Sequence, residues 1–324
     1  MLSLVRFWLI CVLKPRSKTT QRNDLGFTMI ELLVSAVVAS MIITPILFFV
    51  VDVLQTDTRE EIRARSEQEL QTAADFIRRD LSQAIYIYDG QGVNAIRSQL
   101  PDSQNVVLVF WRQEFIPNAV PPPNDRDRDC DNNRCDDAQV FSLVAYYLQT
   151  EREPNSPWSG QARISRLQIR DCPRDSSRNC VGDTRPDDGF QSNFESDEEN
   201  DTLQEIMNGW RASGPIVDES GRPRPREVLI DYIDKTELTG DIDCESRGIS
   251  NDDSDNLLSV GKDSEGNPIY GFFVCVDSRN TAALVNLRMN AAIRIDPNAT
   301  EFNQNQRSLF PETNFLVKGL GLLN

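Results

Sequence analysis

The chain has 324 residues, enough for one large domain or two small ones. Its 50 acidic and 34 basic side chains give a formal net charge of −16, which argues against a nucleic-acid partner. Histidine is absent, so Ser-His-Asp triads, Cys-His nucleophile pairs and His-based zinc sites are excluded. We find no catalytic constellation of another kind in the sequence either, and we therefore expect a protein that is not an enzyme.

The first predicted element is a membrane-spanning helix. Residues 27–51 form a run of 25 residues in which Glu31 is the only charged side chain. A run of this length spans a bilayer as a helix. Residues 1–26 carry five basic side chains against one acidic one, and such a positive flank stays in the cytoplasm. We therefore expect a single-pass protein of the inner (cytoplasmic) membrane, with everything after Val51 periplasmic or extracellular.

The junction between these two segments has a distinctive sequence. Gly26 is followed by Phe27 and Thr28 and then, one helical turn after Phe27, by Glu31. This junction resembles the class III signal of type IV pilins and type II secretion pseudopilins. An ordinary signal anchor is the alternative, but a simple anchor has no use for a carboxylate in the membrane, where the charge is costly.

The resemblance implies both processing and assembly. In that family a prepilin peptidase cuts after the glycine, here Gly26, which removes residues 1–26 as a leader and leaves Phe27 to be N-methylated. Glu31 then pairs with the amine of a neighbouring subunit. The implied partners are the prepilin peptidase, other pilins or pseudopilins, the inner-membrane assembly platform and membrane lipid.

The helix is predicted to continue through residues 52–89 as an amphipathic half. Apolar side chains recur there at steps of three and four residues, as on one face of a helix. They are Ile62, Leu70, Ala73, Ala74, Phe76, Ile77, Leu81, Ala84 and Ile85. The ion pairs expected one turn apart on the polar side are Glu61–Arg65 and Asp75–Arg79. Asp89-Gly90 marks the end of a helix on the order of 90 Å long.

Residues 90–296 are predicted to form a β-rich head, because short β-branched and aromatic runs alternate there with polar loops. The candidate strands are Val106–Trp111, Val140–Leu148, Arg163–Ile169, Val228–Ile233, Ile269–Val276 and Ala282–Ile295. A long helix followed by an antiparallel sheet gives an α+β, pilin-like fold with long loops. Residues 297–324 are polar and then apolar, and we expect this C-terminal tail to dock on the head.

Two longer segments extend the resemblance. AADFIRRDLSQA, residues 73–84, is similar to the helix end of large minor pseudopilins and minor pilins. SEQELQTAADFIRRDLSQAIYIYD together with VLVFWRQEFIP resembles the pseudopilins of the cyanobacterial hormogonium polysaccharide secretion system. This second resemblance implies a fibre that drives polysaccharide export linked to gliding motility.

Cysteine usage predicts disulfide bonds. Seven cysteines are present, and Cys11 falls in the leader, so the exported part keeps six, an even number in an oxidising compartment. Six cysteines allow 15 pairings, and the most economical one closes two short loops and ties a long acidic loop to a strand. These candidate pairs are Cys130–Cys135, Cys172–Cys180 and Cys244–Cys275. Zinc is not expected, because the sequence has no C-x-x-C pair and no histidine.

One loop has an alternating acidic pattern. Asp125, Asp127, Asp129 and Asp131 are spaced like the first half of an EF-type calcium loop. However, no glycine follows for the sharp turn, no glutamate closes the loop, and two interleaved arginines offset the charge. We therefore favour a solvated acidic loop, with Ca²⁺ as the one candidate ligand.

Together these observations favour a minor pseudopilin or minor pilin that enters a pilus-like fibre through its N-terminal helix. The size of the head suits a tip or initiation subunit better than a repeating shaft subunit. The alternative is a membrane-tethered extracytoplasmic protein that binds polysaccharide or calcium and does not polymerise. Glu31 distinguishes the two, because a tether has no reason to keep a carboxylate in lipid.

Overall fold

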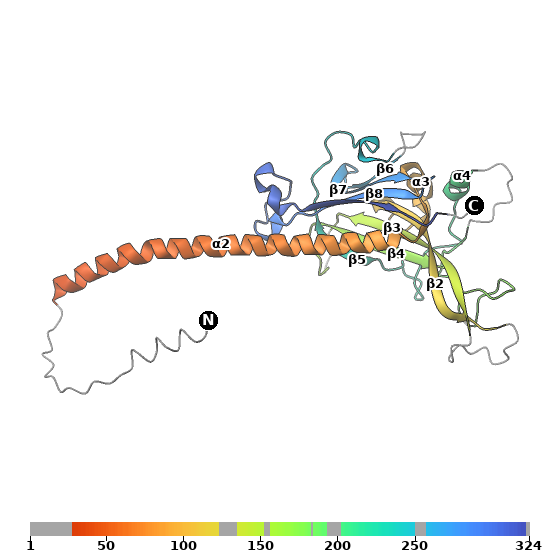
Figure 1. Cartoon of the computed structure of the whole chain (residues 1–324), viewed down its shortest axis with the longest axis horizontal. Coiled ribbons are helices and arrows are strands. Elements are labelled where there is room, and N and C mark those ends of the chain that lie inside the picture. Colours follow the sequence, from red (N-terminus) through yellow and green to blue (C-terminus); the bar gives the residue numbers. More distant parts are fainter. Residues whose placement is uncertain are drawn as a thin grey trace, which may run out of the picture. The chain divides into compact units, whose positions relative to one another are not determined.

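The computed structural model describes residues 28–122, 135–151, 156–182, 184–192, 202–249 and 257–321. A long helix, α2, is followed by antiparallel sheets of five and four strands (Figure 1). The chain divides into two units, residues 1–57 and 58–324. The α+β, pilin-like class expected from the sequence is confirmed.

Helix α2 runs without interruption through 53 residues, Met29–Leu81. Thr28 caps its N-terminus, because the Thr28 hydroxyl accepts a hydrogen bond from the Glu31 N–H at 3.3 Å. Arg78 and Arg79 lie in its last turn, where cations favour the negative end of the helix dipole. Side chains at both ends of the helix therefore stabilise it, one by capping and the others by their charge.

Sheet 1 contains five antiparallel strands in the order β1-β2-β3-β4-β5. Their bounds are Ala84–Ile87 (β1), Val106–Val120 (β2), Asp136–Gln149 (β3), Ala162–Arg170 (β4) and Glu227–Ile233 (β5). The β2–β3 hairpin continues past the edge of β4, so its distal part, from Phe115 opposite Gln139 to Val120 opposite Asp136, is a two-stranded ribbon.

Sheet 2 contains four antiparallel strands in the order β6-β7-β8-β9. Their bounds are Leu258–Lys262 (β6), Pro268–Asp277 (β7), Ala282–Arg288 (β8) and Glu312–Lys318 (β9). An isolated bridge between Ile233 at the end of β5 and Met289 joins the two sheets. Gly271 in β7 permits this junction, because a Cβ atom there would collide with the Asp234 carbonyl.

The main core lies between α2 and one face of both sheets. The buried residues of α2 are Ser66, Leu70, Ala73, Ala74, Ile77, Asp80 and Leu81. The apolar ones share a cluster with alternate strand residues such as Phe110, Val274 and Phe315. A second cluster covers the other face of sheet 1, where Trp111 meets Trp210 and the short helices Gly90–Ile96 (α3) and Leu203–Asn208 (α4).

Short 3₁₀ helices connect these elements. Their bounds are Arg97–Gln99 (η1), Ser103–Asn105 (η2), Glu245–Arg247 (η3), Ala292–Arg294 (η5) and Gln304–Leu309 (η6). The last two lie between β8 and β9 and, with Phe310, form a small apolar cluster of their own.

The amphipathic half of α2 ends at Leu81, earlier than the predicted end near residue 89. The segment Ala84–Ile87 forms β1 instead. Ala84 and Ile87 enter the main core cluster, and Ile85 and Tyr86 enter the second one, with a register shift between Ala84 and Tyr86. Pairing with β2 buries all four residues, which outweighs the helical periodicity. The ion pairs of α2 also differ from those expected. The pairs formed within the helix are Arg63–Glu67, Arg65–Glu69 and Asp75–Arg78.

Several predicted loops contain strands. β6 lies between the candidate strands Val228–Ile233 and Ile269–Val276, and the expected tail over 297–324 includes β9. The hairpin strands β2 and β3 extend beyond the candidate strands Val106–Trp111 and Val140–Leu148, whereas β8 stops short of Ile295. In β9 the buried Phe315 and Val317 alternate with exposed residues, a period of two that is hard to recognise in the sequence because the exposed Leu316 between them is also apolar.

Candidate functional site

The predicted processing and assembly site lies at the start of α2. Gly26 and Phe27 precede the described residues, which begin at Thr28. Glu31 occupies the first helical turn, where a carboxylate favours the positive end of the helix dipole. Within the described residues, the Glu31 carboxylate makes no hydrogen bond or ion pair, so it is free to pair with a group from outside them.

The first half of α2 presents apolar side chains in all directions. The large ones between Met29 and Leu54 are 38–94% exposed. Hydroxyl side chains in this half, such as Ser35 and Thr44, donate to carbonyls of the preceding turn, so they need no water. In the described part of the chain, α2 is the one helix long and apolar enough to cross a membrane. Such a surface is buried only by lipid or by other helices.

The second half of α2 is fixed to the head by a buried carboxylate. Asp80, whose side chain is 4% exposed, accepts hydrogen bonds from three groups of sheet 1. They are Arg112 Nη1 at 2.5 Å, Arg166 Nε at 2.7 Å and the Tyr146 hydroxyl at 2.8 Å. Burial, reinforced by the charge of Asp80, raises the pKa of Tyr146, which therefore stays a protonated donor. Helix and sheet are thus joined by charge-assisted bonds in a dry site.

This cluster extends along the sheet through Glu114. The Glu114 carboxylate pairs with Arg112 and with Arg170, each at 3.0 Å, and accepts a bond from the Gln168 amide at 2.7 Å. A buried pair is costly unless both charges are compensated, and here each carboxylate faces two guanidinium groups. The network therefore fixes one orientation of the end of α2 on sheet 1.

A second polar junction between α2 and the head lies one helical turn before Leu70. Arg294, from η5, donates to the Ser66 hydroxyl at 2.9 Å and pairs with Glu69 at 2.5 Å. Its guanidinium also lies 4.3 Å from the centre of the Tyr232 ring. Two polar clamps, at Ser66–Glu69 and at Asp80, therefore bracket the apolar stripe of α2.

The cysteines give the head two of its expected bridges. Cys172–Cys180 closes a short loop after β4, and Cys244–Cys275 ties the loop before η3 to β7. Cys135 is also disulfide-bonded, whereas Cys130, the partner we expected for it, lies outside the described residues. The bridges are placed beside long loops, which a sheet cannot hold by pairing alone.

The candidate calcium ligands Asp125, Asp127, Asp129 and Asp131 lie outside the described residues. Among the described residues, no group of three acidic or cysteine side chains is arranged to hold a metal ion. Calcium binding by this loop therefore stays a prediction from the sequence.

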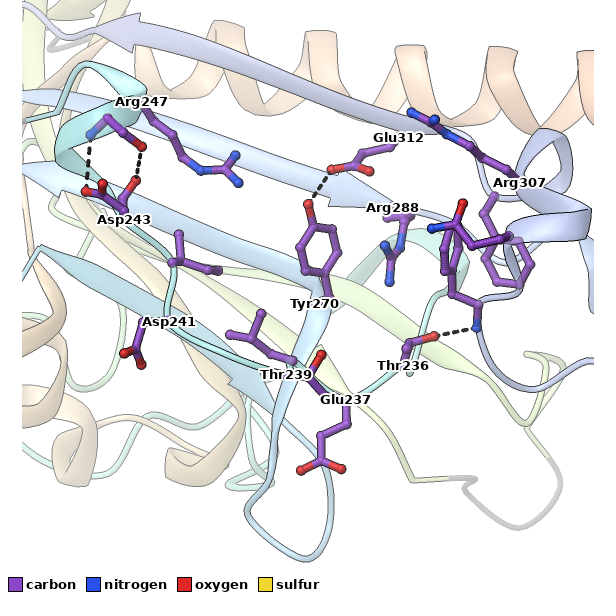
Figure 2. A pocket seen from close by; sticks show the side chains of 16 residues that line it. Thr236, Glu237, Thr239, Asp241, Asp243, Arg247, Tyr270, Arg288, Arg307 and Glu312 are labelled. Carbon is purple, nitrogen blue, oxygen red and sulfur yellow. Dashed lines mark hydrogen bonds between the residues drawn. The ribbon is translucent and has the colours of Figure 1, made fainter.

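A polar cavity of about 790 Å³ lies on the outer face of sheet 2. Figure 2 shows Arg247, Tyr270 and Glu312 converging on it, while Glu237 projects away. The Tyr270 hydroxyl donates to Glu312 at 2.9 Å, and burial followed by this bond raises the pKa of Tyr270. The cavity thus has a wall of polar groups that already bond to one another.

The floor of this cavity is a stacked arginine. Arg288 lies between the rings of Tyr270 and Phe302, at 4.0 and 4.7 Å from their centres. Its guanidinium pairs with the buried Asp234 at 2.5 Å. This stack holds the chain after β5 and the segment before β9 against sheet 2.

Asp80 is the functional residue that the sequence reasoning missed. The sequence does contain an indication of this role. Asp80 lies in the apolar stripe between Ile77 and Leu81, where burying a carboxylate costs free energy unless it has a partner. The partners follow 32 to 86 residues later in the chain, and local patterning does not identify them.

Comparison with known proteins identifies the start of α2. Residues 21–47 match a family model described as the prokaryotic N-terminal methylation motif. No curated protein and no solved structure matches the chain. The match covers the Gly26-Phe27 junction, Glu31 and much of the exposed apolar half of α2. It supports a type IV pilin- or pseudopilin-like protein, and the motif implies processing by a prepilin peptidase and assembly with pilins.

Proposed function

We propose that this chain, which carries the prokaryotic N-terminal methylation motif, is a minor, non-catalytic subunit of a type IV pilus or secretion pseudopilus. The observation that carries the proposal is the division of α2. Its motif-bearing half exposes apolar side chains throughout, whereas its other half is clamped into the head. A subunit built this way enters a fibre by its first half and displays its head with the second.

In this proposal the leader is removed on the cytoplasmic side. The peptidase cuts after Gly26, and Phe27 becomes the methylated N-terminus of the mature subunit. The five basic residues before the junction keep it in the cytoplasm, so the head lies across the inner membrane. The mature chain therefore starts at the membrane surface with a positively charged amine close to Glu31.

Glu31 is the residue through which assembly is selected. A carboxylate at the middle of a bilayer costs about 2.5–3.5 kcal/mol on insertion scales. The Phe27 amine of an entering subunit neutralises that charge, and low dielectric makes an unpaired member of such a pair expensive. Pairing between subunits thus removes a cost that each subunit carries alone, and it sets their axial register.

The head makes this a tip or initiation subunit rather than a shaft subunit. Two sheets, two short helices and disulfide-tied loops are bulky, and a helical lattice of such heads is crowded. The resemblance to hormogonium pseudopilins extends the proposal to a fibre that exports polysaccharide for gliding.

Glu31→Ala tests the proposal. Cleavage after Gly26 should proceed as in the wild type, as read from the mass of the mature N-terminus, while recovery of other pilin-type subunits from detergent extracts should fall strongly. Glu31→Asp, one methylene shorter, should be partly defective. Glu61→Ala, an exposed glutamate later in the same helix, is the matched control and should behave like the wild type.

Two results would contradict the proposal. Persistence of peptides that span Gly26-Phe27 in the membrane fraction would show that the motif is not processed. Equal recovery of partners with the wild-type chain and with the Glu31→Ala variant would favour the tethered, non-polymerising alternative.

A further inference from the structure

A groove of about 920 Å³ lies between the second half of α2 and β5. One wall is the face of α2 that includes Thr72 and Phe76, and the other is β5. The loop Pro157–Ser159 closes one side. All these residues belong to the same unit of the chain. We call this feature the β5 groove.

The β5 groove follows the open edge of a sheet. β5 is the last strand of sheet 1, and in the described part of the chain its outer edge meets another strand only at Ile233. Five consecutive residues, Val228–Tyr232, line the groove. Successive side chains of a strand point to opposite faces, so consecutive lining residues mean that the groove runs along the strand edge. Such an edge is a template for one more strand.

The side chains around the edge suit an apolar occupant. Phe76, from α2, and Trp158, from the loop Pro157–Ser159, both line the β5 groove and are 42% and 40% exposed although both are large and aromatic. Aromatic side chains in this setting are typical anchors of protein interfaces. Leu229 and Tyr232 are partly buried beside them. Water covers these surfaces in the isolated chain, and a partner would displace it.

The charges at the rim are already paired, with one exception. Glu69 bonds to Arg65 and Arg294, and Asp231 accepts bonds from the backbone and hydroxyl of Ser159. Arg79, exposed at the end of α2, pairs with no carboxylate among the described residues. The groove therefore fits a segment that is mostly uncharged and carries one acidic residue at the Arg79 end.

We propose that the β5 groove receives an extended segment of a second pilin-type subunit, which adds to sheet 1 as a strand beside β5. The proposal rests on the proposed function, because the groove is bounded by the same helix that enters the fibre. A subunit packed along α2 therefore passes this edge. Main-chain bonds to Val228–Asp231 would give affinity, and alternate apolar side chains would contact Phe76 and Trp158.

Photo-crosslinking in the native membrane tests where the partner lies. A benzophenone side chain at position 158 of the full chain should form an adduct with another protein that carries the methylation motif, and the crosslinked peptide should come from an extended segment. The control is the same probe at Phe115, which is 63% exposed on the distal ribbon, outside the β5 groove. It should give at least tenfold less of that adduct, a difference of the size that one interface anchor makes. Equal adducts at both positions, or an adduct with a second copy of this chain, would overturn the proposal.

Amide exchange tests how the partner binds. In the complex the backbone amides of Val228–Asp231 that point outward should be protected at least tenfold relative to the free chain, because strand addition engages them. Phe76→Ala and Trp158→Ala should each lower the yield of complex roughly tenfold. Phe115→Ala and Leu316→Ala, at exposed apolar positions outside the groove, should leave it unchanged. Unchanged exchange at β5 in the complex would rule out strand addition.

The failure of this proposal is distinguishable from failure of the proposed function. If Glu31→Ala prevents incorporation while Trp158→Ala and Phe76→Ala do not, the fibre function stands and the β5 groove is not its interface. If neither Glu31→Ala nor the groove variants affect incorporation, both proposals fail. Thermal unfolding of each variant separates loss of the interface from loss of the fold.

Discussion

The two halves of α2 differ in what their side chains contact. In the first half, up to Asp57, the large apolar residues are exposed and the Glu31 carboxylate pairs with no described residue. In the second half, from Thr58, the apolar stripe from Leu70 to Leu81 is buried apart from Phe76, and Asp80 is fully bonded. The same backbone geometry therefore serves two environments. Glu31 has no partner among the described residues, whereas every bond of Asp80 is made within the head. This difference indicates that the first half of α2 is the surface left for other molecules.

Removing Asp80 should have the largest effect on the head. Asp80→Ala leaves Arg112 and Arg166 facing each other without the carboxylate, and breaking such a buried cluster costs about 3–5 kcal/mol. Urea unfolding of the full chain in detergent, followed by the fluorescence of buried Trp111 and Trp210, measures it. Asp75→Ala removes the exposed pair with Arg78 and should change little. Similar losses for both variants would contradict the assignment of Asp80.

Opening the Cys244–Cys275 bridge should have the next largest effect. The bridge closes a separation of 31 residues, and the chain-entropy model gives about 3–4 kcal/mol for its loss. The Cys172–Cys180 bridge spans 8 residues and should contribute about 1 kcal/mol less. Unfolding of the two paired Cys→Ser variants checks this order. A reversed order would show that the loop before η3 is held by its other contacts.

Truncating one leucine in each half compares the halves directly. Leu70→Ala should destabilise the head by about 2–5 kcal/mol, because Leu70 is 1% exposed in the main core. Leu47→Ala, at a position 58% exposed in the first half, should leave the unfolding of the head unchanged. Unfolding curves of both variants in the same detergent provide the test. A loss of head stability with Leu47→Ala would break the distinction between the halves.

The head should also lose stability at alkaline pH. The loss begins at pH 10 and, just above that pH, is smaller than the losses expected from the substitutions. Burial raises the pKa values of Tyr86, Tyr88, Tyr146 and Tyr147 above the ordinary value of 10.0. The unfolded chain therefore releases phenolic protons that the folded head retains. Stability is complete below pH 10 and falls as the pH rises from there toward the folded pKa values.

Tyrosinate absorbance measured together with tryptophan fluorescence checks this pH dependence. The tyrosinate signal of these four residues should appear together with unfolding. Simple titration near pH 10 in a head that stays folded would contradict their burial.

What the sequence predicts well is periodic and local. The apolar run, the motif around Gly26 and the stripe at Leu70, Ala73 and Ile77 are all visible without a structure, and so are most strands. The segment Ala84–Ile87 was misassigned because its residues fit a continued helical face and also pair with β2. The strand β9 was missed because its period of two covers few residues.

The contacts of Asp80 lie beyond such reasoning for a different reason. An acid beside Ile77 and Leu81 indicates that a partner exists, but Arg112 and Arg166 are two of many arginines in the chain. Which of them arrives depends on the order and register of β2 and β4 in sheet 1. Long-range pairs of this kind follow from topology, which a single sequence does not display.

The position of β9 has a consequence for the order in which the head is synthesised and folds. Phe315 and Val317 of this last strand belong to the same cluster as Leu70 of α2, and the Gly321 N–H donates to the carbonyl of Ala84 at 3.3 Å. The core thus joins the first part of the head to be synthesised with the last. Contacts so distant in sequence form slowly and only after the whole chain is present. The first half of α2 is therefore synthesised before the head can close, and a chain whose synthesis stops before β9 has a long apolar helix without a finished core.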